Sequence, residues 1–489
     1  MRASKAPAFC LGLSLYWAWV YLSFNSLQIS GETSTGDPFI PVLHVVSGFV
    51  GCLTFVACAL LHRRIEAMLD SRRPALLALL WAASALTTAG TLLYSLPGTP
   101  EGRIAGVIGG VVSGLASPAI ALAWGVACCR IDVRAATRTT ALAFAVAGAL
   151  YALVSALPQP YAGILVSFAP LVSILCLQFC WSPTGALAAA LDCGGARGVS
   201  GGAPRSAAPD SGFASMLRSP GQQRVLLGIL MTMFVCGGMR VYLMGLDAEV
   251  FANPLLMAVP IVAVSLLFLG YSSLLPRVSL NLGPLYRIAV PLFAIAFAAV
   301  AMFGTSNANV SFVIVTAGAT LIDMLTWVLV IETARTTRFS ALLVFSASRL
   351  AIHAGMAAGE LVAMRLAPGS MAGFFLASAV ILLVVVAVMF TDRDTTFLFE
   401  PPGAGELSVA EERGGEYDLG ARVGRVAREY DLSPRETEVF ALWARGFGSK
   451  AIEGKLEVSP ATVKTHLRHI YEKCDVHNRA EILELIERA

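Results

Sequence analysis

Five ionisable residues stand inside long apolar stretches between residues 225 and 391. They are Arg240, Asp323, Arg349, His353 and Glu360. A charge in the middle of a membrane span costs about 2.5–3.5 kcal/mol on insertion scales, so such residues mark functional sites or pairs. Three interpretations stay open: pairs that hold helices together, a site for a small-molecule ligand, and proton coupling.

The position of each charge along its apolar stretch estimates its depth. At about 1.5 Å of rise per residue, Asp323 and Arg349 lie at similar depths on consecutive spans, so an ion pair between them is geometrically possible. Arg240 and Glu360 both lie nearer the predicted outer side. Our hypothesis is that Asp323 and Arg349 pair in one state and that ligand binding repartitions them.

A second set of residues, near the end of the chain, has the chemistry to read DNA. In "VSPATVKTHLRHIYEKC" (458–474), apolar residues recur at helical spacing, and three polar residues project from the opposite side. The apolar residues are Val463, Leu467 and Ile470; the polar ones are Lys464, Thr465 and Arg468. Lysine and arginine donate to guanine in the major groove, and the threonine methyl meets a thymine methyl. A solvated helix face is the alternative reading of the charges alone.

Capping signals divide the tail around this stretch into short helices. Ser433, Pro434 and Glu436 form a capping box before a first helix, and Ser449 precedes a second. Ser459 caps the third helix and leaves backbone amides near a phosphate. Asn478 with Glu481 begins a fourth helix. Helices two and three are three residues apart, a helix-turn-helix spacing.

Residues 431–489 closely resemble the LuxR/GerE-type DNA-binding domain. The resemblance rests on "LSPRETEV" (432–439), "GFGSKAIEGKL" (446–456), "VSPATVKTHLRHIYEKC" (458–474) and "VHNRAEIL" (476–483), in the family's order and spacing. It implies base contacts by Lys464, Thr465 and Arg468. It also implies phosphate contacts by Thr462, Lys450 and Lys473, and a homodimer surface on the fourth helix made of Ile482, Leu485 and Ile486.

The rest of the chain has the composition of a membrane protein. The chain has 489 residues, 56% of them hydrophobic and 14% charged, whereas soluble domains carry about 25% charged residues. Apolar windows long enough to span a bilayer recur about twelve times. They lie near 8–29, 39–61, 74–96, 104–129, 137–157, 160–181, 225–246, 253–275, 284–304, 308–331, 340–364 and 370–391.

The basic residues between these windows set the expected orientation. Arginines gather in alternate loops, for example Arg63, Arg64 and Arg130, whereas Arg103 and Arg365 are the ones in the other set. The positive-inside rule then predicts a multi-pass protein of a bacterial cell membrane with both termini cytoplasmic.

These elements predict an all-α chain with two parts. A polytopic bundle of six plus six helices covers 1–391, with halves 1–181 and 225–391 joined by a cytoplasmic linker over 182–224. A second linker covers 392–430, where "LGARVGRVAREYD" (419–431) can form a short helix, and the helix-turn-helix domain covers 431–489. The bundle resembles the major facilitator superfamily in topology. The loop "AMLDSRRP" supplies Asp70, Arg72 and Arg73 but lacks the glycines that this family usually has there, which favours a sensor over a transporter.

The sequence therefore predicts a membrane-anchored one-component transcription regulator. Its partners would be double-stranded promoter DNA, the lipid bilayer, a second copy of the chain and a small-molecule ligand. The alternative is a facilitator-type transporter with a fused DNA-binding tail. An enzyme has little support because no phosphate-binding glycine loop, metal cluster or nucleophile motif is present, so no cofactor is expected.

Overall fold

The computed structural model forms two compact units, Met1–Glu400 and Pro401–Ala489. Each has its own hydrophobic core. The residues that the structure describes are 5–26, 39–71, 73–95, 100–131, 133–158, 160–180, 212–244, 253–274, 294, 308–337, 339–366, 371–389, 423–444, 456, 460–474, 476 and 485.

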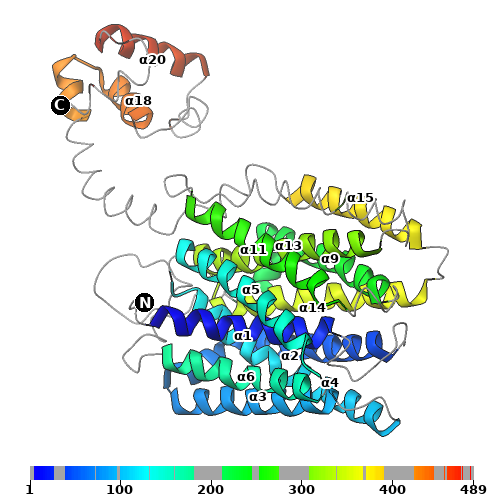
Figure 1. Ribbon diagram of the computed structural model, residues 1–489. Coiled ribbons are helices and arrows are strands. Elements are labelled where there is room, and N and C mark those ends of the chain that lie inside the picture. Colours follow the sequence, from blue (N-terminus) through cyan, green and yellow to red (C-terminus); the bar gives the residue numbers. More distant parts are fainter. Residues whose placement is uncertain are drawn as a thin grey trace. The chain divides into compact units, whose positions relative to one another are not determined.

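The first unit is a bundle of long helices lying side by side along a common direction (Figure 1). The first half contains α1 (Ala6–Asn25), α2 (Phe39–Ser71), α3 (Arg73–Tyr94), α4 (Pro100–Cys128), α5 (Val133–Ser155) and α6 (Tyr161–Cys180). The second half contains α8 (Phe213–Arg218), α9 (Pro220–Met244), α11 (Leu255–Leu274), α13 (Ala308–Thr336), α14 (Ala341–Arg365) and α15 (Met371–Met389). Within the described residues the fold is entirely helical, as predicted.

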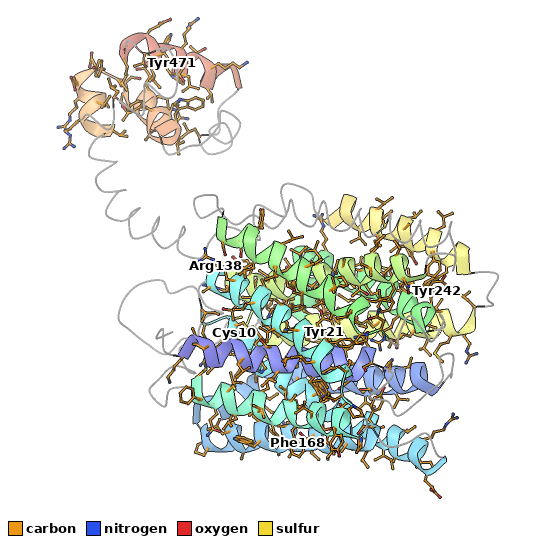
Figure 2. The ribbon with its side chains drawn as sticks, viewed as in Figure 1. Cys10, Tyr21, Arg138, Phe168, Tyr242 and Tyr471 are labelled. Carbon is orange, nitrogen blue, oxygen red and sulfur yellow. The ribbon has the colours of Figure 1, made fainter. Side chains whose placement is uncertain are left out.

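Most of the predicted spans are present as helices. Within the described part of the chain, 10 helices are long and apolar enough to cross a membrane, and α15 contributes a shorter apolar helix over Gly373–Val385. Of the span predicted near 284–304, the structure describes Ala294, which is buried in the core of the first unit. Large apolar side chains such as Leu153 and Leu267 are exposed on the bundle surface, as helices that face lipid require. Figure 2 shows Phe168 at this surface and Tyr21 in the interior.

The segment predicted as a linker over 182–224 is partly structured. The short helix α8 lies within it, and Met216 of that helix is fully buried in the core of the first unit. The end of the predicted linker therefore belongs to the bundle. Its apolar Phe213 and Met216 explain the difference, because they have a core to pack against.

Contacts between the two halves gather on two helix pairs, α2 with α14 and α5 with α11. Hydrogen bonds also join the halves at the helix ends predicted to face the cytoplasm. Arg335 of α13 donates to the Ile131 carbonyl at 2.6 Å, and Arg138 of α5 donates to the Ser272 carbonyl of α11 at 3.4 Å.

The closest approach within the second half joins α9 to α14. A Cβ at Gly237 would clash with the Met356 carbonyl, and one at Gly359 would clash with the Phe234 carbonyl. Small residues allow helix backbones to touch in membranes. This contact matters for the site because it brings two predicted charged residues, one from each helix, to the same place.

The second unit begins earlier than residue 431. A helix over 423–429, in the segment predicted as a linker over 392–430, buries Val423 and Val426 in the core formed by α18 (Pro434–Ala444) and α20 (Pro460–Cys474). The Leu432 amide donates to the Ala427 carbonyl at 2.8 Å, and Asp431 adopts a φ of 46°. This is the hydrogen bond and left-handed residue of a helix C-terminal cap.

Candidate functional sites: an exposed basic helix and a charged membrane cavity

The predicted capping box at the start of α18 is confirmed. The Ser433 amide donates to Glu436 Oε2 at 2.8 Å, and the Glu436 amide donates to Ser433 Oγ at 3.3 Å. Helix α18 begins at Pro434, as the Pro at the first helical position predicts. Val439 and Phe440 on its inner face are fully buried.

The two faces of α20 are as predicted. Val463 and Ile470 are fully buried and Leu467 nearly so. On the opposite face Lys464, Thr465 and Arg468 are exposed, and Thr462 is half-buried. The Arg468 side chain is 66% exposed, and its Nε lies 3.7 Å from Glu472 Oε1. An exposed pair of this kind contributes about 0–1 kcal/mol, so Arg468 is readily available to another partner.

Lys473 holds the second unit together. Its Nζ lies 2.8 Å from Glu436 Oε2 and donates to the Asp431 carbonyl at 2.9 Å. The Lys473 ammonium and the Ser433 amide and hydroxyl lower the pKa of Glu436 from 4.5 to about 2. The phosphate contact implied for Lys473 stays a prediction, but here its charge fixes α20 to the cap of α18.

The remaining residues predicted for DNA binding or dimerisation fall mostly outside the described residues. These are Lys450, Ser459, Ile482 and Ile486. Leu485 is described, and it is partly buried against the core of the second unit. The dimer surface on the fourth helix stays a prediction, and part of the Leu485 side chain is already used within its own unit.

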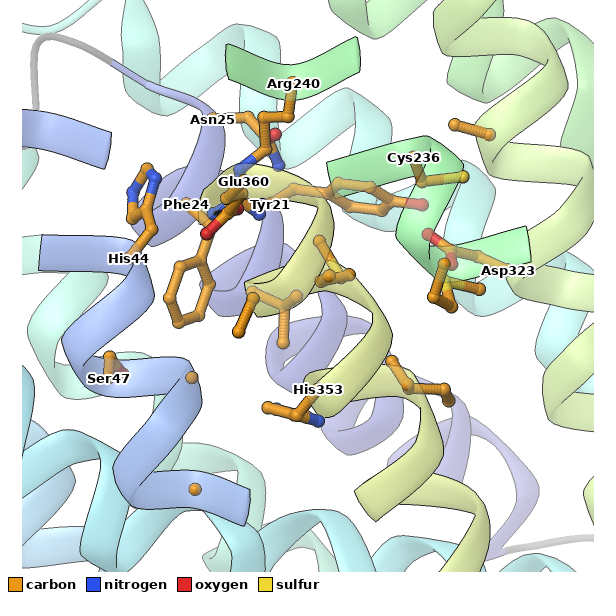
Figure 3. Close-up of a pocket in the computed structure, with 18 of the residues that line it drawn as sticks. Tyr21, Phe24, Asn25, His44, Ser47, Cys236, Arg240, Asp323, His353 and Glu360 are labelled. Carbon is orange, nitrogen blue, oxygen red and sulfur yellow. Dashed lines mark ion pairs between the residues drawn. The ribbon is translucent and has the colours of Figure 1, made fainter. Parts of the chain in front are cut away.

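The five charged residues predicted in the membrane spans line one cavity of about 220 Å³ in the first unit. The walls of this cavity, which we call the central cavity, come from α1, α2, α4, α9, α11, α13 and α14. Figure 3 shows Arg240, Glu360, His353 and Asp323 around it. The structure thus brings together residues that are more than a hundred positions apart in the sequence.

One ion pair of the cavity joins α9 to α14. Arg240 Nη2 lies 3.0 Å from Glu360 Oε1, and the side chains are 15% and 3% exposed. The Arg240 guanidinium also lies 5.7 Å from the centre of the Phe24 ring of α1. The glycine contact between α9 and α14 permits this pair. The two charges therefore neutralise one another, although the buried Nε of Arg240 has no hydrogen-bond partner among the described residues.

Arg349 is 8% exposed and lies over two indole rings. Its guanidinium carbon is 4.5 Å from the centre of the Trp327 ring and 5.5 Å from that of Trp17. Cation–π contacts of this kind contribute about 0.5–2 kcal/mol. Within the described part of the chain, no group accepts a hydrogen bond from its guanidinium and no carboxylate pairs with it.

Asp323 also faces the central cavity and is partly exposed to it. In Figure 3 the Tyr21 side chain extends toward Asp323 and Cys236. The ion pair that we considered between Asp323 and Arg349 is not formed within 4.0 Å in this structure, although both residues are described. The two opposite charges line the same cavity without direct contact.

His353 lies one helical turn from Arg349. Its Nδ1 is 2.9 Å from the Arg349 carbonyl, so this nitrogen carries the proton and donates. Its ring lies 5.0 Å from Phe55 of α2. Among the described residues, no group of three or more histidines, cysteines or carboxylates has the spacing of a metal site.

The sequence reasoning missed the aromatic wall of the cavity. Tyr16, Trp17, Tyr21 and Phe24 of α1 line it. The signal was visible in the aromatic density of "LYWAWVYLSF" (15–24), but such a run is also common in helices that only pack. His44 of α2 also lines the cavity, and its Nε2 lies 3.2 Å from the Tyr94 hydroxyl.

The comparisons with known proteins divide along the same two units. Residues 431–486 match the family described as bacterial regulatory proteins, luxR family. The chain is 33% identical over 66 residues to the HTH-type transcriptional regulator MalT of Vibrio cholerae, covering 14% of this chain and 7% of MalT. It is 32% identical over 81 residues to the nitrate/nitrite response regulator protein NarL of Escherichia coli, covering 16% of this chain and 38% of NarL.

The chain thus spans well under half the length of these relatives. The crystal structure of an auto-inhibited POT family peptide transporter covers 79% of this chain and 96% of its own, with a TM-score of 0.50 and 11% identity. At that identity the likeness concerns the fold. The chain therefore joins a membrane unit with a transporter-like helical fold to a carboxyl-terminal LuxR-family helix-turn-helix domain, the DNA-binding module of transcription regulators.

Proposed function

We propose that this protein is a membrane-anchored one-component transcription regulator, in which the central cavity senses a small molecule and α20 reads promoter DNA. The observation that carries the proposal is the presence, in one chain, of a LuxR-family domain and of a membrane cavity lined by two opposite charges that form no ion pair with each other. A bundle that only anchored the domain would have no need of Arg349 and Asp323, because buried charges are costly.

The reading surface follows from the exposure of α20. Lys464, Thr465 and Arg468 contact bases in the major groove, and Thr462 lies near the phosphates. For this the second unit faces the cytoplasm, so both termini lie on that side of the cell membrane. Because the anchored chain stays in the bilayer, the promoter must come to the membrane.

A homodimer on DNA is part of the proposal. One copy of a domain without a strong basic field binds weakly, and two copies on adjacent half-sites gain affinity. Ile482→Asp and Ile486→Asp test the fourth helix more cleanly than a change at Leu485, which also packs against its own core. Sedimentation of the Pro401–Ala489 unit with operator DNA would measure the stoichiometry, and a persistent dimer in both variants would move the interface elsewhere.

The deciding experiment is chromatin immunoprecipitation of the full chain with and without candidate compounds. Ligand-dependent promoter occupancy is expected. Arg468→Ala should reduce occupancy of the specific promoter, whereas Arg349→Gln should retain occupancy and lose its response to the ligand. Occupancy that does not change with any variant of the cavity would reject the sensor role.

The transporter-like fold favours a second candidate, a small-molecule transporter with a DNA-binding tail. The two candidate functions differ in whether the protein moves its ligand across the membrane. Vesicles that contain the protein should bind a ligand without accumulating it if the membrane unit is a sensor. Time-dependent, saturable uptake that is lost in Arg349→Gln would establish the transporter instead.

A further inference from the structure

Two of the charged residues around the central cavity form an ion pair with each other, and two others do not. Arg240 and Glu360 lie 3.0 Å apart. Arg349 is more than nine-tenths buried, has no hydrogen-bond or ion-pair partner among the described residues, and lines the cavity. Asp323 lines the same cavity and is not within ion-pair distance of Arg349. What remains open to a ligand is therefore one positive and one negative group.

The cost of this arrangement indicates the ligand's charge. A buried charge needs an opposite charge and hydrogen bonds to offset its desolvation. A ligand that is only anionic would pair with Arg349 but would be repelled by the carboxylate of Asp323. A ligand that is only cationic would pair with Asp323 but would be repelled by the guanidinium of Arg349. A ligand with one charge of each sign satisfies both residues and keeps the site neutral.

The walls and the volume indicate the ligand's body. Trp17, Tyr21, Phe24 and Phe55 form an aromatic part of the wall. The guanidinium of Arg349 lies over the ring of Trp17 and over that of Trp327 behind the wall. An engineered apolar cavity of about 150 Å³ holds benzene. A cavity of about 220 Å³ therefore has room for one ring with two short polar substituents. Because Arg349 and Asp323 do not touch, the two charges of the ligand must be separated.

We infer that the central cavity binds a small zwitterionic ring compound, whose carboxylate lies on Arg349 and whose ammonium group lies on Asp323. This inference rests on the proposed function, since it gives the chemical class of the sensed ligand. His353, with its Nδ1 committed to the Arg349 carbonyl, presents only Nε2 as a further acceptor. Binding gives an opposite charge to each of two charged groups that lie apart in this structure.

Three probes of nearly equal shape test the charge requirement on the full-length protein in lipid nanodiscs. They are 4-(aminomethyl)benzoate, which has both charges, 4-methylbenzoate, which is only anionic, and 4-methylbenzylamine, which is only cationic. Titration calorimetry should find the zwitterion bound at least about tenfold more tightly than either analogue, as expected for one charged hydrogen bond. Quenching of tryptophan fluorescence gives a second readout, because Trp17 lies in the wall.

Two charge-neutral variants should each remove one half of this preference. Arg349→Gln should lose the advantage of the zwitterion over 4-methylbenzylamine, and should bind that amine at least as well as wild type. Asp323→Asn should lose the advantage over 4-methylbenzoate and keep or improve the binding of that anion. Retained binding of one probe shows that each variant is folded. Arg365→Gln, an exposed arginine on the same helix α14, is the matched control and should change neither preference.

The outcomes separate this inference from the proposed function. No binding of the zwitterion to the wild type, or the same order of the three probes in both variants, overturns the ligand class. The predicted binding pattern without any change in promoter occupancy keeps the ligand class and rejects the sensor role. Promoter occupancy that responds to another compound, while the zwitterion does not bind, keeps the sensor role and rejects this ligand class.

Discussion

Arg349 and Arg468 are the same residue type in opposite circumstances. Arg468 is 66% exposed beside a loosely placed carboxylate. Arg349 is 8% exposed, lies over two indole rings and has no carboxylate within ion-pair distance among the described residues. Water already satisfies Arg468, so its contribution begins only when a base replaces that water. Folding has already removed most water from the guanidinium of Arg349. A ligand that binds it therefore does not have to desolvate or orient this charge.

The comparison teaches that exposed and buried charges should respond differently to substitution. Removing an exposed charge affects binding and leaves stability nearly unchanged. Removing one member of a buried pair affects stability first, because the other member is left uncompensated. Four predictions test this difference, from the largest expected effect to the smallest.

The largest effect is expected at the buried pair of α9 and α14. Glu360→Gln should destabilise the membrane unit by about 3–5 kcal/mol, because it leaves Arg240 buried without a counter-charge. The thermal midpoint of the full-length protein in detergent measures it. Arg240→Met combined with Glu360→Met should recover most of the loss. If the single variant melts like wild type, water rather than Glu360 satisfies Arg240, and the contrast with α20 is lost.

The next effect concerns a charge that is buried but lies in the second unit. The pKa of Glu436 falls from 4.5 to about 2 on folding, so its stabilisation is full above pH 4.5 and is lost as the pH falls towards 2. The shift corresponds to about 3 kcal/mol. Urea unfolding of the Pro401–Ala489 unit between pH 6 and pH 2 measures it.

Two variants on α18 make that measurement specific. Glu436→Gln should remove this part of the pH dependence, and Glu438→Gln, whose parent side chain is half-exposed, should leave it in place. An unchanged pH profile in Glu436→Gln would show that other carboxylates cause the acid loss. Lys473→Met should reproduce much of the Glu436→Gln effect, since it removes the same contact.

The third effect is on DNA affinity rather than on stability. Arg468→Ala should cost about 1–3 kcal/mol at the specific site and relax the preference at one base pair. Electrophoretic mobility shifts with the Pro401–Ala489 unit and a randomised operator would detect both changes. That unit, rather than one beginning at 431, is the suitable fragment because Val423 and Val426 belong to its core. If wild type and Arg468→Ala bind every operator with the same affinity, Arg468 lies outside the groove.

The smallest effect is expected from the partner of Arg468. Glu472→Gln releases an exposed pair at 3.7 Å, so unfolding stability should change by less than about 0.5 kcal/mol. DNA affinity should rise slightly because one negative charge leaves the reading face. A large loss of stability would mean that the exposed pair behaves like a buried one.

The two regions also differ in how far the sequence predicts them. Local signals were enough for α18 and for both faces of α20, because caps and helical periodicity act within a few residues. The contact of Lys473 with Glu436 was not predictable, because the two residues are brought together by packing across the core. The short helix expected at the end of the predicted linker over 392–430 is present over 423–429. Its place in the second unit was not predicted, because Val423 and Val426 become core residues only when α18 and α20 are present.

In the membrane unit, depth predicted the gathering of charges but not their pairing. Rise per residue gives the height of Asp323 and Arg349 along the bundle, whereas pairing also depends on the rotation of each helix. That rotation is fixed by close contacts such as those at Gly237 and Gly359. The pair that forms, Arg240 with Glu360, lies where these glycines bring α9 and α14 together.

The glycine contact between α9 and α14 has a mechanical consequence. Where Met356 and Phe234 carbonyls meet glycines, no flexible side chain lies between the two backbones to absorb a displacement. Helices α9 and α14 are therefore expected to move together as one rigid body, and the Arg240–Glu360 ion pair adds a second contact between them. A bound molecule that displaces Arg349 or His353 therefore also displaces α9, whose start follows directly on α8, the short helix that buries Met216.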